Sequence, residues 1–380
     1  MKPKNILWQG LHVCVESYAC NDCGAEIIED LRVGHAVNYP YQIDLNKAQI
    51  FGEKTASKWL GLPLFNSLIS PNNRDIKISK EVFKASERVI IINCIDFLYG
   101  HCLLKLLNAQ KYLEKFPEYG LIVIIPKLIR WMVPQGIAEV WTVDISLKDA
   151  YDYYPSFHQF VCIEAERFSE VYVSRAHSHP SQFDISKFTG VAKHNFEQEE
   201  LQITFIWRED RIWSSLLTQR ILSKLKMSQI ALMLQNWRVE RLFKRIRSAI
   251  PSARFFVAGL GTKTQFPKWI EDYRVDSFNE KAEREVCEIY SASRLVIGIH
   301  GSNMLCPSGH AGMTIDLMPR DRWGNIAQDI LYQEADPRLA SFRYRYLPLG
   351  IKIADLAYIA SSMLMKQPEV YLLMSADKSA

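Results

Sequence analysis

Two kinds of apolar pattern alternate along this chain of 380 residues. Unbroken apolar runs, such as RVIIIN at 88–93 and LIVII at 121–125, are typical of strands buried on both faces. Between these runs, residues 101–113 carry leucines at helical spacing, which predicts an amphipathic helix. The alternation of strand and helix predicts an α/β fold with a parallel sheet.

The same alternation occurs in both halves of the chain. In the first half, Ile6–Trp8 is predicted as the first strand, and weaker strand patterns lie at 140–143 and 171–173. In the second half, the pattern predicts strands at 202–207, 253–258, 295–299 and 314–318, and helices at 236–249, 280–291 and 353–366.

The pattern stops between the halves, where residues 177–200 are polar and irregular. We therefore predict two Rossmann-like domains of typical size. The predicted boundaries are an N-terminal domain over 1–185, a linker over 186–200, a C-terminal domain over 201–345 and a helical tail over 346–380. Packing of the tail back on the N-terminal domain is one option.

Composition narrows the class of protein. With 48% hydrophobic and 23% charged residues, the chain is globular over most of its length. No apolar run approaches the ~20 residues that span a bilayer, and the N-terminal sequence lacks the apolar core of a signal peptide. We therefore expect a cytoplasmic protein. The net charge of +4 is too small to indicate nucleic-acid binding.

Two groups of residues have the spacing of metal ligands. Cys20 and Cys23 form a CxxC pair with Cys14 and His12 upstream, but the second paired half-site of a structural zinc site is absent. Reduced loop cysteines are the preferred interpretation, and zinc is the alternative. His177 and His179 lack a third ligand, and no Asp-x-Asp pair stands at a strand end. We expect no metal.

A loop of small polar residues follows the strand predicted at 295–299. His300, Gly301, Ser302 and Asn303 come directly after it, and a helix is predicted to begin near Asn303. Small residues expose backbone N–H groups, and a helix N-terminus favours negative charge, so this loop suits a phosphate or diphosphate. A tight turn with an internally bonded histidine is the alternative.

Two arginines stand at a second strand end of the same predicted sheet. Arg208 and Arg211 follow the strand at 202–207, and arginines hold phosphate oxygens through paired hydrogen bonds. A salt-bridged surface turn is the alternative, because Glu209 and Asp210 lie between them. The nearby sequence GLGTKT at 259–264 lacks the glycine spacing of dinucleotide or P-loop motifs.

These motifs together resemble those of the family 61 glycosyltransferases. The run SRLVIGIHGSNMLCPSGHAGMTIDLMP at 293–319 resembles the family signature, WREDRIW at 207–213 its arginine motif, and YGHCLLKLL at 99–107 its N-terminal motif. The sequence departs from the family in having Ser302 for alanine, followed directly by Asn303, and in lacking Asn-Glu after the arginine motif. Residues 1–85 match no part of the family pattern.

The resemblance implies a GT-B-like architecture, in which two Rossmann-like domains face each other across a cleft. It further implies an inverting, metal-independent enzyme that uses a nucleotide sugar as donor and needs no other cofactor. A UDP sugar is the preferred donor. The expected partners are that donor and a glycan or glycolipid acceptor in polysaccharide or glycan assembly, with peripheral membrane contact left open.

The resemblance also suggests a role for each site residue. His101 is the preferred base for the acceptor hydroxyl, and Asp96 is its rival. Arg208 and Arg211 would bind the diphosphate. The four residues His300, Gly301, Ser302 and Asn303 would meet phosphate or donor sugar. Asp316 would bind a ribose or sugar hydroxyl, or merely cap its strand. Phe278–Glu280, just before a predicted helix, is a candidate segment for framing the nucleotide base.

Two alternatives to a glycosyltransferase remain open. One is a non-catalytic GT-B-like protein that binds a nucleotide or glycan, and the other is a different nucleotide-dependent Rossmann enzyme. The aromatic residues Trp131, Trp141 and Tyr151–Tyr154 are candidates for stacking on acceptor sugars, although core and surface packing is the preferred interpretation.

Overall fold

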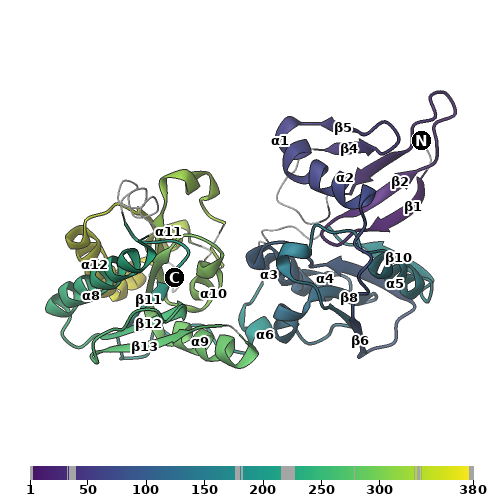
Figure 1. Ribbon diagram of the computed structural model, residues 1–380. Helices are drawn as coiled ribbons and strands as arrows, with labels where there is room; N and C mark the ends of the chain where they lie inside the picture. Colours follow the sequence, from purple (N-terminus) through teal and green to yellow (C-terminus); the bar gives the residue numbers. More distant parts are fainter. Residues whose placement is uncertain are drawn as a thin grey trace. The chain divides into compact units, whose positions relative to one another are not determined.

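The computed structural model describes residues 3–31, 33, 40–175, 180, 183–214, 227–277, 279–328, 330–331, 334 and 336–375. His177, His179 and Phe278 lie outside these residues. The chain forms two compact units, Met1–Asp184 and Ile185–Ala380 (Figure 1), and each is described by itself. The predicted linker at 186–200 falls within the second unit and contains the short helix α6 (Ser186–Thr189).

A five-stranded sheet forms the centre of the first unit, in the order β10-β7-β8-β9-β6. Four strands are parallel: β7 (Arg88–Asn93), β8 (Gly120–Pro126), β9 (Glu139–Val143) and β10 (Glu170–Val173). They confirm the predicted strands to within one residue. The fifth strand, β6 (Ile78–Val82), was not predicted and pairs antiparallel with β9. Its sequence ISKEV is largely exposed, so it lacks a buried-strand pattern.

The helix predicted over 101–113 is two helices, α3 (Tyr99–Leu107) and α4 (Ala109–Lys115). Asn108 separates them, and its Nδ2 donates to the carbonyl of Leu104 at 2.9 Å. Asparagine side chains compete in this way with the helical backbone bonds. Further along the unit lie the 3₁₀ turns η2 (Lys127–Met132) and η3 (Leu147–Asp149) and the helix α5 (Pro155–Ala165).

The first predicted strand is confirmed, but it lies outside the parallel sheet. Ile6–Trp8 belongs to an antiparallel meander, seen as purple and violet strands in Figure 1, whose strands are β1 (Pro3–Trp8), β2 (Val13–Ser17), β3 (Ile27–Asp30), β4 (Tyr41–Asp44) and β5 (Gln49–Gly52). A helical segment follows, made of α1 (Lys54–Ala56), the π-helix η1 (Ser57–Gly61) and α2 (Leu62–Ile69). Leu60 and Leu64 from this segment pack with Tyr41 and Ile43 of the meander.

The second unit contains one parallel sheet of six strands, in the order β13-β12-β11-β14-β15-β16. Its strands are β11 (Gln202–Trp207), β12 (Arg254–Leu260), β13 (Ile270–Val275), β14 (Ser293–Ile299), β15 (Met313–Met318) and β16 (Tyr344–Pro348). The four predicted strands are confirmed. The two edge strands, β13 (IEDYRV) and β16 (YRYLP), were missed because charged and polar residues interrupt them.

Helices and turns connect and cover this sheet. They are α8 (Ser228–Ala249), α9 (Glu280–Ala292), η4 (Ser302–Met304), α10 (Leu305–His310), η5 (Arg320–Asn325), α11 (Pro337–Arg343) and α12 (Ile353–Ser375). Helix α8 begins eight residues before the predicted start at 236, and α12 continues nine residues past the predicted end at 366. The long helices therefore exist where the periodicity placed them, but with different ends.

The C-terminal helix packs on the second unit. Leu356, Ala360 and Leu364 of α12 are buried in the same cluster as Val239 and Phe243 of α8. Their 4-residue spacing puts them on one face of the helix. The predicted helical tail therefore contributes to the core of the second unit.

Both units are α/β and Rossmann-like, with parallel strands joined by helices, so the predicted fold class is confirmed. Two units of this kind are the components of a GT-B-like fold. Within the described part of the chain, no helix combines the length and the apolar character needed to cross a membrane.

The packing of α12 gives a direct test of its place in the core. Leu356 is fully buried, so we expect Leu356→Ala to lower the free energy of unfolding of the second unit by about 2–5 kcal/mol. Met365 on the same helix is 57% exposed, so Met365→Ala is the matched control and changes stability by less than about 0.5 kcal/mol. Urea unfolding followed by circular dichroism measures both. Equal stability of the two variants would contradict the packing described.

Candidate functional site

The carboxyl edge of the second sheet gathers the predicted donor-site residues. Because β11, β14 and β15 are parallel neighbours, the loops after them leave the sheet at one edge. Arg208 follows β11, His300 follows β14, and Asp316 lies within β15. The sequence predicted this meeting, and the structure brings these residues together.

Two arginines converge on one backbone carbonyl at this edge. Arg211 Nη1 donates to the carbonyl oxygen of His300 at 2.6 Å, and Arg208 Nη1 approaches the same oxygen at 3.3 Å. Arg208 also donates to Asn303 Oδ1 at 2.5 Å and forms a two-pronged ion pair with Asp210. Among the described residues, Arg211 donates no hydrogen bond beyond the one to His300. Its other guanidinium donors are therefore available to an anion.

Gly301 is the residue that lets the arginines approach the loop. A Cβ atom at this position would lie 2.6 Å from Arg208 Nη1 and 3.0 Å from Arg211 Nη1. The φ angle of +145° also favours glycine. Ser302 beside it is exposed, and Asn303 is half-buried with a buried Nδ2 that has no hydrogen-bond partner in the described residues.

The helix predicted to begin near Asn303 is short. The structure has a 3₁₀ turn, η4, and then the six-residue helix α10. Such a short helix contributes little dipole, so the positive character of this edge comes from arginine side chains. The proline, serine and glycine inside α10 explain why the helix does not continue.

His300 and Asp316 form a buried pair behind the loop. His300 Nδ1 lies 2.9 Å from Asp316 Oδ2, and the hydroxyl of Tyr344 on β16 donates to the same oxygen at 2.9 Å. Both residues of the pair are almost fully buried. Asp316 therefore orients the His300 ring, and the pair fixes the loop whose carbonyl the arginines contact.

The side chain of a buried glutamine holds the loop Arg208–Trp213, called the arginine loop below. Gln235 of α8 is fully buried; its Nε2 donates to the carbonyl of Arg208 at 2.9 Å, and its Oε1 accepts from the backbone N–H of Trp213 at 2.7 Å. Both ends of the Arg208–Trp213 loop are thus attached to one side chain. The sequence analysis missed Gln235, since nothing in its helix distinguishes it from a surface glutamine.

Arg322, on η5 after β15, is a third arginine at this edge. Burial, together with the charges of Arg208 and Arg322, lowers the pKa of Arg211. An arginine remains charged at neutral pH despite such a shift. Burial is the largest cause of the shift, and the charges of Asp210 and Asp321 oppose it. The sequence analysis missed Arg322, although it stands just after the strand of Asp316.

The glycine loop at 259–264 is occupied by an internal ion pair. Glu209 Oε1 accepts from the backbone N–H of Lys263 at 3.1 Å, and its Oε2 lies 2.6 Å from Lys263 Nζ. Gly261, with φ +110°, packs directly on Glu209, so a side chain there would clash. The loop is therefore bound to the arginine loop.

In the first unit, the predicted base and its rival contact each other. His101 Nδ1 lies 3.2 Å from Asp96 Oδ1, at the carboxyl end of β7 and the start of α3. Asp96 Oδ2 lies 3.0 Å from Lys105 Nζ, which also donates to the carbonyl of Ile95 at 2.7 Å. The His101 side chain is 20% exposed, whereas those of Asp96 and Lys105 are buried.

Asp96 is ionised at neutral pH in spite of its burial. Burial raises its pKa, but the positive charge of Lys105 and the hydrogen bond with His101 outweigh it and lower the pKa to about 2. The ionised carboxylate of Asp96 accepts a hydrogen bond from His101 Nδ1–H, and Nε2 lies on the opposite side of the ring.

Lys105 was missed as a site residue, although a signal was present. It lies four residues after His101 on a helix otherwise buried through leucines. A lysine on the buried face of a helix requires a buried counter-charge, and Asp96 is that charge.

The cysteine cluster is divided by the meander. Cys14 is buried in β2, whereas Cys20 is half-buried and Cys23 exposed at the β2–β3 hairpin. His12 is fully buried, with Nδ1 2.6 Å from Asp30 Oδ2. Among the residues that the structure describes, no three histidine, cysteine or acidic side chains come together as a metal site.

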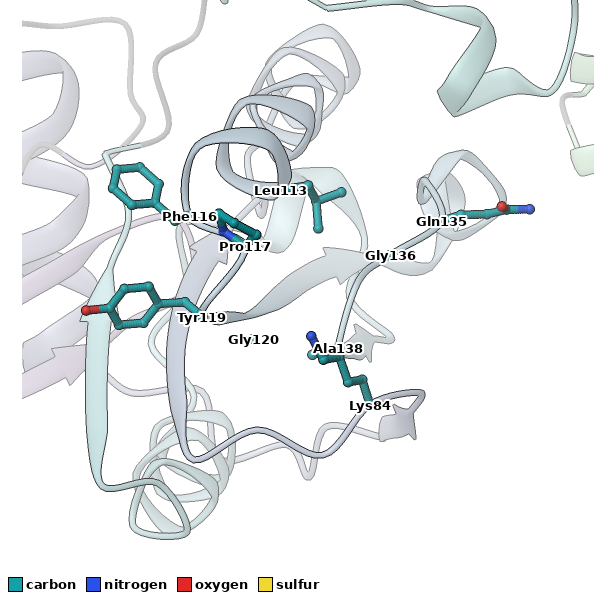
Figure 2. A pocket seen from close by; sticks show the side chains of 9 residues that line it. All are labelled: Lys84, Leu113, Phe116, Pro117, Tyr119, Gly120, Gln135, Gly136 and Ala138. Carbon is teal, nitrogen blue, oxygen red and sulfur yellow. The ribbon is translucent and has the colours of Figure 1, made fainter.

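A pocket of about 260 Å³ lies at the other edge of the first sheet. Figure 2 shows its lining side chains, which surround Gly120 at the start of β8 and Ala138 just before β9. Amino ends of parallel strands lie opposite the edge that carries Asp96 and His101. This pocket is therefore separate from the candidate site.

Comparisons with known proteins were made by sequence and by structure. No protein-family model matches the chain, and no curated protein does. Among solved structures it is similar to E. coli ADP-heptose LPS heptosyltransferase II, with 7% identity, TM-score 0.42, and coverage of 74% of this chain and 99% of the other.

Two further solved structures show a similar level of likeness. A putative UDP-N-acetylglucosamine 2-epimerase from Listeria monocytogenes has 11% identity and TM-score 0.36, covering 75% of this chain and 89% of the other. Accessory secretory protein 1, 2 and 3 in Streptococcus pneumoniae has 8% identity and TM-score 0.33, covering 97% and 64%. These values assign no role to any residue of this chain, and none bears on family 61, so that resemblance stays a prediction.

The buried Asp96–Lys105 pair makes a prediction about stability. Lys105→Met leaves a buried carboxylate without its counter-charge, so we expect the free energy of unfolding to fall by about 3–5 kcal/mol at pH 7. Lys111→Met, at an exposed position on α4, is the control and is expected to be neutral. Urea unfolding monitored by circular dichroism compares the two.

The pH dependence of the free energy of unfolding is a second test of the Asp96–Lys105 pair. The pKa of Asp96 is lowered from 3.8 to about 2, so its contribution to stability is present above pH 4 and is lost as the pH falls from about 4 to about 2. In Lys105→Met the pKa of Asp96 rises, so less stability is lost as the pH falls through this range. An unchanged acid unfolding profile in Lys105→Met would contradict the pairing.

Proposed function

We propose that this protein is an inverting, metal-independent glycosyltransferase that uses a nucleotide sugar, UDP-type first, and a glycan or other hydroxyl acceptor. The observation that carries the proposal is the convergence of Arg208 and Arg211 on the His300–Gly301 loop. The family 61 resemblance and a role in polysaccharide or glycan assembly belong to the same proposal.

The arginine cluster suits the leaving group of this reaction. Negative charge grows on the diphosphate as the bond to the sugar breaks, and fixed cations stabilise it without having to reorganise. Arg211 is expected to make the main contact through its remaining donors, with Arg322 adding charge. Arg208 is oriented by Asp210 and Asn303, and it holds the loop in shape.

The buried pair behind the loop is expected to position the donor. His300 is oriented by Asp316, which also accepts from Tyr344. Asp316 is fully buried, so its effect on a ribose or sugar hydroxyl is proposed to act through His300. Asn303 Nδ2 is a further donor suited to a phosphate or sugar oxygen.

His101 is the proposed base and Asp96 its positioning residue. The base removes the proton from the acceptor hydroxyl as that oxygen attacks the anomeric carbon from the face opposite the leaving diphosphate. The Asp96 carboxylate, 1% exposed, holds the His101 ring through Nδ1, which directs Nε2 to the acceptor. As His101 becomes positively charged, the ionised Asp96 stabilises it.

The nucleotide proposal is tested by ligand-induced stabilisation. We expect one of UDP, GDP, CMP or ADP to raise the melting temperature in the presence of EDTA, and NAD to have no effect. A ligand at 100 times its dissociation constant stabilises by about 2.7 kcal/mol. Arg211→Ala is expected to weaken binding about tenfold or more, because it removes a charge-assisted contact.

Arg254→Ala is the matched control. Arg254 begins β12, so it stands at the amino edge of the same sheet, where it pairs with Glu271. We expect this variant to bind the nucleotide as the wild type does. Binding that requires a divalent cation, or that is equal in Arg211→Ala and wild type, would contradict the proposal.

The base is tested by steady-state kinetics once the donor is known. His101→Ala is expected to lower kcat by about 10²–10⁴-fold, with the KM for the donor unchanged, because proton transfer is lost. Added imidazole is expected to restore part of the rate. Asp96→Asn is expected to lower kcat as well, but without rescue by imidazole, since the His101 ring is still present.

Three results would count against this assignment. They are unchanged kcat in His101→Ala, lost nucleotide binding in the same variant, and wild-type protein that binds nucleotide but transfers no sugar. The last result would favour the non-catalytic binding protein.

A further inference from the structure

A groove in the first unit lies next to the proposed base. It has a volume of about 570 Å³ and is lined by Lys54, Thr55, Lys58, Trp59, Pro63 and Tyr151. Five of these residues come from the helical segment α1–η1–α2, which the sequence analysis did not predict. Tyr151 comes from the loop before α5, about 90 residues further along the chain.

An unbroken set of aromatic rings connects the groove to His101. Phe97 stacks on Tyr151 with ring centroids 4.7 Å apart, and meets Trp59 edge-on at 6.4 Å. The same Phe97 ring meets His101 edge-on at 6.0 Å. Both groove rings therefore contact the side chain, Phe97, that also contacts the proposed base.

The two aromatic side chains have the properties of a sugar-binding surface. Trp59 is 42% exposed, so a face of its ring is accessible to a ligand in the groove. Exposed indole faces pack on the apolar C–H face of a pyranose ring, and their N–H groups remain polar. Burial and the nearby charge of Asp96 raise the pKa of Tyr151, so its hydroxyl stays protonated and is a hydrogen-bond donor.

The charged residues lining the groove are all positive. Lys54 and Lys58 are exposed, and among the described residues neither has an ion-pair partner. By contrast, Lys47 and Lys80 in the same unit are paired with Asp44 and Glu164. In the part of the chain that the structure describes, no acidic residue lines the groove. The carboxylate of neighbouring Glu53 caps α1 by accepting from the backbone N–H of Ala56.

The local backbone explains how this surface is presented. Residues 57–61 form a π-helix, a rare conformation that recurs at functional sites. Leu60 and Gly61 of this π-helix are buried against the meander. A Cβ atom at position 61 would lie 3.0 Å from Ile50 Cγ2. The segment is thus fixed to the meander through one face, while Lys58 and Trp59 remain exposed on the other.

We propose that this groove binds a sugar ring bearing an anionic group, with Trp59 and Tyr151 packing on the ring and Lys54 and Lys58 binding the carboxylate or phosphate. The description of that ring as the acceptor rests on the proposed function. The binding itself does not, because every residue concerned lies in the first unit. The shared chemistry is an acidic saccharide, with its charge on a uronic acid or a sugar phosphate.

Binding is tested on the full-length chain by ligand-observed NMR titration with three probes. These are methyl glucoside, glucuronate and glucose 1-phosphate, which share a pyranose ring and differ in charge. We expect at least one anionic probe to bind about tenfold more tightly than the neutral one at low salt. The Arg211→Ala background removes binding of phosphate at the second unit from the comparison.

Variants separate the ring contact from the charge contact. Lys54→Gln/Lys58→Gln is expected to abolish the preference for the anionic probe and to leave binding of the neutral probe unchanged. Trp59→Ala is expected to weaken binding of all three probes, and Trp59→Phe to restore part of it. Lys111→Gln/Lys115→Gln, on exposed positions of α4, is the control with the same change in net charge. All the mutated side chains are exposed, so the variants are expected to fold.

The probes also identify the source of the charge. A preference for glucuronate alone indicates a uronic acid, and one for glucose 1-phosphate alone a sugar phosphate; either supports the proposal. Equal binding of neutral and anionic probes would overturn it, and so would equal loss of the preference in the α4 control. Failure to bind any probe in wild-type protein would overturn it too.

Failure here is distinguishable from failure of the proposed function. If an anionic sugar binds in a way that depends on Trp59, but the protein binds no nucleotide, the groove proposal is supported and the transferase proposal is rejected. If sugar is transferred and the acceptor KM is unchanged in Trp59→Ala and in the double lysine variant, the transferase proposal is supported and the groove proposal is rejected.

Discussion

All six strands of the second unit run in one direction, and this constraint places the candidate donor site. In a parallel sheet every strand ends at the same edge, so residues far apart in sequence are brought side by side without any special contact between them. Arg208, His300 and Asp316 meet for this reason. The details then depend on shape: Gly301 has no side chain to keep the guanidinium groups away, and Gln235 fixes both ends of the arginine loop.

In the first unit, the corresponding constraint is that a buried carboxylate, Asp96, remains ionised. Asp96 is stabilised by Lys105 and by its hydrogen bond with His101, and its burial alone would have the opposite effect. A paired buried charge of this type contributes little net stability but is costly to break. It is therefore better explained by what it does to the partly exposed His101 ring, whose orientation it fixes, than by any need of the fold.

The sequence predicted the parallel strands well, because buried strands such as RVIIIN and QITFIW are continuous apolar runs. It failed where burial is partial. The meander β1–β5 and the edge strands β13 and β16 mix charged and apolar residues, and their pairing depends on partners that no local pattern reveals. At the site, single residues directly after strands were identified, but Lys105, Gln235 and Arg322 were missed. Their significance comes from what lies opposite them, as the buried Asp96 does for Lys105.

The backbone carbonyl of His300 accepts hydrogen bonds from both Arg208 and Arg211 within the protein itself. On the proposed function, an incoming phosphate meets guanidinium groups that are already oriented, and it binds the donors of Arg211 that the carbonyl leaves unused. Orienting these side chains in advance lowers the entropy lost on binding. The carbonyl dipole held against both cations also offsets part of their charge, so the loop backbone would moderate the attraction for the spent nucleoside diphosphate and help product leave. Rapid turnover and tight product binding are therefore opposing demands on the same two side chains.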